Sequence, residues 1–187
     1  GVLKLVAANA LPTGTTLDVG SSAPAVASTF DLNGFDQTVG ALQRSSGATG
    51  GPSYVTNSGP SIRTLTVNQS ATTTYSGSMT GNLALTKQGG GILWLPGANS
   101  YVGPTDVRAG LLIVQNNSAL GASTAGTTVQ NGATLDLQTG SNLTLAEPIT
   151  LNGVNGAGNR GALRSYGAFS HTLNGPLTLG SDGGINV

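Results

Sequence analysis

The sequence contains no cysteine and a single histidine, His171. Without cysteine, the chain has no disulfide framework, no thiolate metal site and no cysteine nucleophile. With one imidazole, it cannot form a site that requires two, such as that of a His-x-x-x-His zinc enzyme. These absences exclude several of the common catalytic and metal-binding arrangements.

Charged residues are also scarce. Lys plus Arg number 7 and Asp plus Glu number 7, so the formal net charge is zero and charged residues make up 7% of the chain. Because a nucleic-acid-binding surface needs a basic face, we expect no nucleic-acid partner. No long apolar run is present, so no membrane-spanning helix is expected, and the first residues show no signal-peptide pattern.

Glycine and short alternating apolar segments are abundant, whereas helical spacing of apolar residues is missing. Apolar-x-apolar triplets recur throughout, among them Leu65-Thr-Val67, Leu93-Trp-Leu95, Leu135-Asp-Leu137 and Leu177-Thr-Leu179. In a strand, such a triplet places both apolar side chains on one face. The pattern predicts an all-β protein built from short strands.

Internal repeats indicate how these strands are arranged. In a short repeat, Gly91–Leu95 resembles Gly110–Val114, and in a long repeat, Gly1–Leu11 resembles Gly110–Leu120. The spacing of the short repeat is typical of one coil of a three-sided solenoid, whose coils stabilise one another by stacking about 4.8 Å apart. We therefore expect a parallel β-solenoid of about eight coils, roughly 40 Å long. A β-sandwich of short strands is the alternative.

Residues 85–114 carry a specific motif. The segment Leu85-Thr-Lys-Gln-Gly-Gly-Gly-Ile-Leu-Trp-Leu-Pro-Gly-Ala-Asn-Ser-Tyr-Val-Gly-Pro-Thr-Asp-Val-Arg-Ala-Gly-Leu-Leu-Ile-Val114 resembles the passenger-associated transport repeat of bacterial autotransporters. Residues 32–42 and 55–59 are similar to the same class of passenger. The resemblance implies a right-handed parallel β-helix outside the cell, exported through an outer-membrane barrel. We expect residues 1–187 to form one β-helix segment of a longer protein.

Four strand residues depart from the motif, in which outward positions are usually small and polar. These outward positions are instead large and apolar: Ile92, Trp94, Leu111 and Ile113. The short repeat stacks Ile92 on Leu111 and Trp94 on Ile113. A contiguous apolar patch often marks a contact surface, so we predict lateral contact with another chain or another segment here. Coverage by the loop at residues 44–60 is the alternative.

The carboxylates do not indicate a catalytic site. They are scattered along the chain: Asp18, Asp31, Asp36, Asp106, Asp136, Glu147 and Asp182. Asp31 and Asp136 occupy matching positions in the continuation of the long repeat, so both are expected to point to solvent, about 20 Å apart, and to form no acid–base pair. Calcium-binding Gly-Gly-x-Gly-x-Asp repeats are absent, and no metal or cofactor is expected.

Histidine and tyrosine are the remaining candidates for binding. His171 is expected at the surface near a corner of the solenoid. The tyrosines are expected to cover corners or, alternatively, to stack on sugars: Tyr54, Tyr75, Tyr101 and Tyr166.

Together these features favour a non-enzymatic structural segment of an extracellular or cell-surface β-helical stalk or fibre. The expected partners are further coils of the same protein and a homo-oligomer or filament, because low charge leaves little repulsion between neighbouring rods. An adhesin that binds host protein or glycan is the first alternative. A polysaccharide-degrading β-helix enzyme is the second, and it lacks the clustered carboxylates that such chemistry needs.

Overall fold

The computed structural model describes residues 1–21, 23, 25–45, 50–153, 157–158 and 160–187. Within these ranges every regular element is a β-strand, and every pair of neighbouring strands is parallel. Parallel pairing throughout excludes a sandwich of antiparallel hairpins. The expected solenoid is therefore confirmed.

The strands form three walls. The first wall contains β1 (Val2–Lys4), β3 (Ser28–Asp31), β6 (Ser53–Asn57) and β9 (Ser78–Gly81), and in the last coils the pair β16 (Thr144–Leu145) and β19 (Thr172–Leu173). The second wall contains β4 (Gln37–Val39), β7 (Arg63–Asn68), β10 (Leu83–Gln88), β12 (Thr105–Val107), β14 (Thr127–Val129), β17 (Ile149–Leu151) and β20 (Leu177–Leu179).

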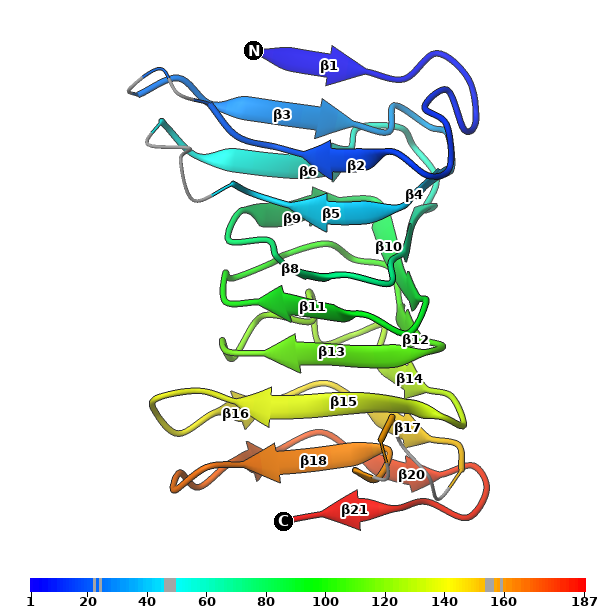
Figure 1. Cartoon of the computed structure of the whole chain (residues 1–187), viewed down its shortest axis with the longest axis vertical. Coiled ribbons are helices and arrows are strands. Elements are labelled where there is room, and N and C mark those ends of the chain that lie inside the picture. The colour runs from blue at the N-terminus through cyan, green and yellow to red at the C-terminus, as the bar shows by residue number, and fades with distance from the viewer. Residues whose placement is uncertain (22, 24, 46–49, 154–156, 159) are drawn as a thin grey trace.

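The third wall begins with the pair β2 (Thr16–Asp18) and β5 (Ala41–Gln43). It continues as a six-stranded sheet of β8 (Thr72–Thr74), β11 (Ile92–Leu95), β13 (Gly110–Val114), β15 (Ala133–Gln138), β18 (Leu163–Tyr166) and β21 (Ile185–Asn186). In Figure 1 the third wall faces the viewer with its strands running to the left, while β3 and β6 run to the right behind it, so the chain winds in a right-handed sense as it descends.

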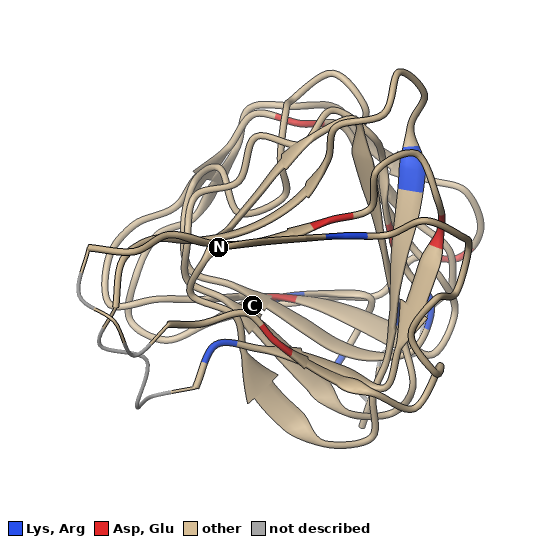
Figure 2. Ribbon diagram, turned by 90° about the horizontal axis from the view of Figure 1, so that it is seen from above, with Lys and Arg blue, Asp and Glu red and all other residues tan. Residues whose placement is uncertain are grey.

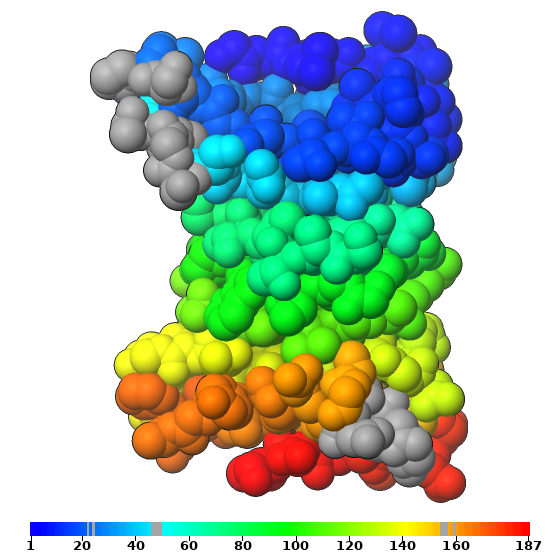
Figure 3. Space-filling view, viewed as in Figure 1, coloured from blue at the N-terminus to red at the C-terminus, as the bar shows by residue number. Residues whose placement is uncertain are grey.

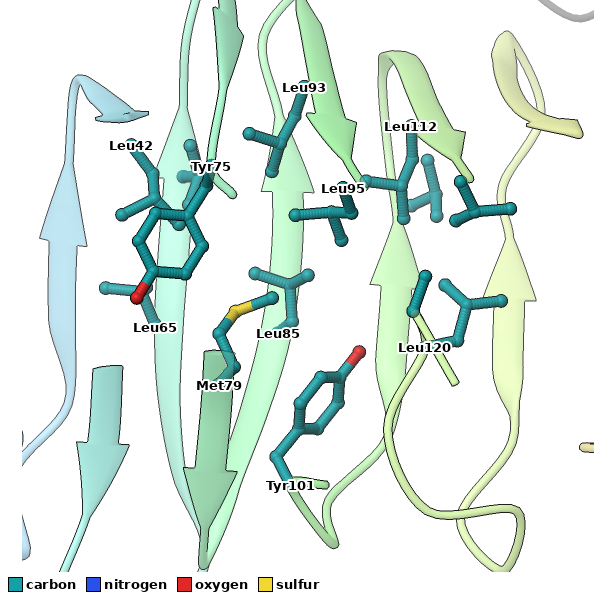
Figure 4. Close-up of a cluster of buried hydrophobic side chains, with 14 of the residues drawn as sticks. Leu42, Leu65, Tyr75, Met79, Leu85, Leu93, Leu95, Tyr101, Leu112 and Leu120 are labelled. Carbon is teal, nitrogen blue, oxygen red and sulfur yellow. The ribbon is translucent and has the colours of Figure 1, made fainter. Parts of the chain in front are cut away.

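The coils enclose a triangular cross-section (Figure 2), and the charged residues are few and spread around its walls. The second wall alone supplies seven strands, and the first coil precedes its first strand, which gives about eight coils. Each coil contributes a small number of inward side chains to one continuous column, shown in Figure 4. Because burying one large apolar side chain stabilises by about 1.5–3 kcal/mol, a single coil cannot offset its own ordering entropy, whereas stacked coils can.

The register confirms the short repeat and corrects the long one. Ile92 pairs with Leu111 and Trp94 with Ile113, as the short repeat predicts. The long repeat, however, matches β1 on the first wall with β13 on the third wall. The similarity arises because all three walls use the same apolar-x-apolar strand, so it does not identify equivalent positions.

The third wall is interrupted between β5 and β8, which belong to different sheets. The backbone N–H of Arg44 donates to the carbonyl oxygen of Thr74 at 2.9 Å, and the Thr73 hydroxyl donates to the carbonyl oxygen of Leu42 at 2.7 Å. These bonds hold the two coils together where a regular ladder is missing. The outer surface has a step at this interruption, between β5 and β8.

Candidate functional site

The segment at residues 85–114 runs from β10 through β11 and β12 to β13. Its inward residues belong to the hydrophobic core and are at most 1% exposed: Leu85, Leu93, Leu95, Leu112 and Val114. Ile92, Trp94, Leu111 and Ile113 alternate with them and face outward, outside the core cluster. The alternation therefore places each of these residues on the face that the sequence predicted.

Glycines in this segment permit close stacking at the corners. A Cβ on Gly91 would overlap the carbonyl oxygen of Ala71 in the preceding coil. Gly110 has a φ of +68°, and its Cβ would overlap the carbonyl oxygen of Gly91. A Cβ on Gly90, by contrast, meets nothing within 4 Å. Two of these positions therefore need glycine because the neighbouring backbone leaves no room for a side chain.

Lys87 is the most unusual residue of the segment. It stands in an inward column of the second wall, between Val67 and Val107, and is fully buried. Its ammonium group donates to the carbonyl oxygens of Gln88 at 2.8 Å, Gly89 at 2.9 Å and Ala109 at 3.1 Å. Burial lowers the pKa of Lys87 to about 8. The side chain thus links the corner of its own coil to the corner of the next coil.

Asn99 links three coils. Its Oδ1 accepts the backbone N–H of Met79 at 2.7 Å, and its Nδ2 donates to the carbonyl oxygen of Ala119 at 2.5 Å. The side chain is almost completely buried, so water cannot replace these bonds. Met79 lies in the coil before and Ala119 in the coil after, so one amide side chain fixes the spacing of both neighbours.

A buried polar column continues from the segment into the following coils. The Tyr101 hydroxyl lies 2.5 Å from Thr105 Oγ1, and the Thr127 hydroxyl donates to Glu147 Oε1 at 2.5 Å. Thr105 and Thr127 are register partners on the second wall. Burial raises the pKa of Glu147 to about 7, and the hydrogen bond from Thr127 opposes this shift only in part. Burial also raises the pKa of Tyr101.

The outward carboxylates differ from the expectation in one respect. Asp31 and Asp136 were expected to be exposed to solvent, but they are 3% and 0% exposed. Asp31 accepts hydrogen bonds from the backbone N–H groups of Asn33 and Ser58 and from the Ser58 hydroxyl. Burial by itself raises the pKa of Asp31, but these bonds together with nearby Lys4 outweigh it and lower the pKa.

Asp136 is covered by a neighbouring coil. Arg164, its register partner on β18, forms an ion pair with it, and the same guanidinium lies 4.5 Å from the centre of the Tyr166 ring. The prediction of solvent-exposed carboxylates failed because side chains one coil away cover them. Asp31 and Asp136 lie on the first and third walls and do not form a pair.

The predicted apolar patch is assembled, although half of it is covered. Leu111 and Ile113 are only 5% and 2% exposed, whereas Ile92 and Trp94 are half-buried. The alternative cover was the loop at residues 44–60. Within that loop, residues 53–57 form β6 on the first wall, and residues 46–49 lie outside the described part of the chain. The accessible apolar surface here is therefore provided by Ile92 and Trp94.

Aromatic and histidine side chains are placed as follows. Tyr75 and Tyr101 are fully buried in the core (Figure 4), so the expectation that they cover corners or stack on sugars is wrong for these two. Tyr166 is 51% exposed. His171 is half-buried and accepts the backbone N–H of Leu143 at its Nδ1, 3.1 Å away. The sequence does not place these two tyrosines because they follow strands at corners, where strand alternation no longer applies.

No group of three or more His, Cys, Asp or Glu side chains that suits a metal ion occurs among the described residues. In the same part of the chain, no helix has the length and hydrophobicity needed to cross a bilayer.

Comparison with known proteins gives two matches. Residues 85–114 match the family described as passenger-associated transport repeat. The chain is also similar to the adhesin BmaC autotransporter of Brucella suis biovar 1 (strain 1330), with 34% identity over 124 residues. That alignment covers 66% of this chain and 3% of the relative. No solved structure matches the chain.

Proposed function

The chain is a β-helical autotransporter passenger segment that carries a passenger-associated transport repeat, and on this premise we propose that it acts as a structural spacer in a stalk on the bacterial cell surface. The observation that supports this role is the linkage between coils. Lys87 and Asn99 each bridge from their own coil to neighbouring coils through buried hydrogen bonds. A rod whose coils are fixed in this way is stiff, so it keeps the parts of the protein at its two ends at a constant distance.

The proposal includes the absence of catalysis. Among the described carboxylates, Asp31 is held by Ser58 and Asn33, and Asp136 is held by Arg164. Glu147 accepts a hydrogen bond from the Thr127 hydroxyl, and no second carboxylate among the described residues contacts it. General acid–base hydrolysis of a glycan uses two carboxyl groups about 5–10 Å apart, and these residues are committed to structural contacts instead.

Segment exchange in the full-length protein tests the spacer role. Residues 1–187 are replaced by a β-helical segment of equal coil number from another protein, and the surface level is matched by immunoblot. A spacer predicts that attachment and the activity of the distal parts of the protein are retained. Loss of attachment or of the activity of the distal parts after the exchange, at equal surface level, contradicts the spacer role.

An adhesive role is the second candidate, and the name of the similar Brucella protein favours it. Because this chain spans 3% of the length of that relative, the adhesive activity can reside elsewhere in such a protein. Binding of the purified segment to host-cell surfaces or matrix proteins, measured directly, separates this role from that of an inert rod.

Self-association into an oligomer or filament is a further proposal about partners. Its support is the zero net charge, which leaves little repulsion between rods. Sedimentation of the purified chain over a wide concentration range tests it, and a monomer at every concentration contradicts it.

A further inference from the structure

An open cleft lies at the step between β5 and β8. It has a volume of about 610 Å³ and is lined by Gln43, Arg44, Ser45, Thr72, Thr73, Thr74 and Ser76. Small-molecule sites typically occupy about 300–1,000 Å³, so the cleft has room for a ligand of several rings. Figure 3 shows this face, on which the outline of the molecule narrows at the green middle coils between wider blue and yellow regions.

The lining of the cleft consists of groups that form hydrogen bonds with hydroxyls. Thr72 and Thr74 are exposed and alternate with Thr73, whose hydroxyl is committed to the backbone of Leu42. A threonine hydroxyl both donates and accepts, as the hydroxyls of a polyol do. Both exposed threonines lie on the outer face of the third wall, in register with Ile92 and Trp94.

An aromatic platform borders the cleft. Trp94 is the register partner of Thr74, and Ile92 is the partner of Thr72, so both lie one coil below the threonines. Both are half-buried, and the next coil supports them with Leu111 and Ile113. Trp94 does not itself line the cleft but lies beside it, and a half-buried indole has little conformational freedom to lose on binding.

Arg44 lies at the border of the cleft, but its guanidinium is held at the corner. Its Nη2 donates to the carbonyl oxygens of Gly50 at 3.2 Å and Gly51 at 3.1 Å, its Nε is buried, and its charge acts on the hydroxyl of the buried Tyr75. The guanidinium is therefore not available to an occupant of the cleft. No acidic side chain is among the described residues that line the cleft. Asp18 lies at its upper edge, where Gln43 and Ser45 donate to it.

A second copy of the chain fits this surface less well. A stable protein interface buries about 800 Å² on each partner around an apolar centre. Here Leu111 and Ile113 are 5% and 2% exposed, so the accessible apolar area is limited to Ile92 and Trp94, and the threonine hydroxyls border it. This combination matches an occupant with one apolar face and many hydroxyls.

We propose that this cleft is a saccharide-binding site. A pyranose ring stacks its apolar face on Trp94, while the hydroxyls of the same or the adjacent sugar bond to the exposed hydroxyls of Thr72 and Thr74. The occupant is an oligosaccharide, because a single ring fills only part of a cleft of about 610 Å³. This inference goes beyond the spacer role and does not depend on it.

The test uses the fact that Trp94 is the single tryptophan of the chain, so intrinsic tryptophan fluorescence reports on this position alone. The purified segment is screened on an array of neutral and uronic-acid-containing oligosaccharides, and each bound glycan is titrated against Trp94 fluorescence. We expect a saturable change in fluorescence for at least one glycan. We also expect at least tenfold weaker array binding by Trp94→Ala and by the isosteric double variant Thr72→Val/Thr74→Val.

Phe169→Ala is the matched control, because Phe169 is an exposed aromatic residue outside this cleft. Its glycan binding should equal that of the unmodified chain, and circular dichroism should show that all variants are folded. Absence of binding to every glycan overturns the proposal, as does binding that Trp94→Ala leaves unchanged. A dimer in sedimentation that Trp94→Ala converts to monomer also overturns it, because a second copy then occupies the surface. Failure of this test leaves the segment exchange unaffected, so the two proposals are distinguishable.

Discussion

The ammonium nitrogen of Lys87 lies 3.1 Å from the carbonyl oxygen of Ala109, which connects the corner after β10 to the corner before β13. The same nitrogen also bonds to the carbonyl oxygens of Gln88 and Gly89. A buried cation is costly unless its donors are all satisfied, and here three carbonyl oxygens of two coils satisfy them. The position is therefore sensitive to the loss of the ammonium group.

Lys87→Met tests this linkage. Methionine fills similar space but leaves the carbonyl oxygens of Gln88, Gly89 and Ala109 without this donor, so we expect a loss of about 1–3 kcal/mol in the free energy of unfolding. Lys4→Met is the control, because the Lys4 side chain is 56% exposed in its contact with Asp31 and should cost less than about 1 kcal/mol. Urea unfolding followed by circular dichroism measures both, and equal effects would show that the buried bonds are unimportant.

Gly91→Ala is expected to be strongly destabilising. The added methyl group overlaps the carbonyl oxygen of Ala71, and the backbone cannot shift without breaking the bond from the Ile92 N–H to that oxygen. We expect a loss of more than about 2 kcal/mol. Gly90→Ala, next to it, meets no atom within 4 Å and should change stability by less than about 1 kcal/mol. Thermal unfolding of the pair is decisive, and similar midpoints would contradict the described corner packing.

Asn99→Ala removes the acceptor for the Met79 N–H and the donor for the Ala119 carbonyl. Both backbone groups remain buried, so we expect a loss of about 2–3 kcal/mol. Amide hydrogen exchange at Met79 should accelerate in the variant, because its proton loses its partner. Asn68→Ala, at an exposed position at the end of β7, serves as the control and should leave both quantities unchanged. An unchanged exchange rate at Met79 in Asn99→Ala would be inconsistent with the bridge.

Glu147 predicts a specific pH dependence. Burial raises its pKa from 4.5 to about 7, so between these values the folded state binds a proton that the unfolded state has released. The contribution of Glu147 to stability is therefore largest below pH 4.5 and decreases as the pH rises toward 7. At pH 8 the buried charge costs about 1–3 kcal/mol relative to the protonated form.

Glu147→Gln keeps an acceptor for the Thr127 hydroxyl and removes the titration. We expect this variant to be more stable than the unmodified chain at pH 8 and nearly equal to it at pH 5, as judged from urea midpoints across this range. The pKa values of Asp18 and Asp31 are lowered, so their contributions are lost only at more acidic pH and do not interfere. A difference between the two proteins that does not vary with pH would contradict the assignment.

Several features of the fold follow from local pattern. Leu93 and Leu95 lie inward because period-2 alternation fixes the faces of a strand, and the short repeat sets the stacking of Ile92 on Leu111. These relations involve residues within one coil or between adjacent coils of nearly constant length. The long repeat failed because strands of all three walls share one pattern and therefore carry no information about the wall.

The candidate site was harder to anticipate. The sequence indicated Trp94 and Ile92 as outward apolar residues, but it did not show the cleft beside them, because the cleft arises where β5 and β8 fail to form a regular ladder. Lys87 was visible only as a motif residue, and its burial depends on the corner carbonyl of Ala109 in the following coil.

By itself, the sequence determined the β-solenoid, its inward leucines and its autotransporter-type repeat, because alternation, coil length and glycine corners are properties of short stretches of chain. The tertiary structure alone decided which polar groups are buried. Asp136 is enclosed because Arg164, 28 residues away, pairs with it from the next coil. Such contacts depend on which residue of a neighbouring coil stands opposite, and variable corner lengths hide that register from the linear sequence.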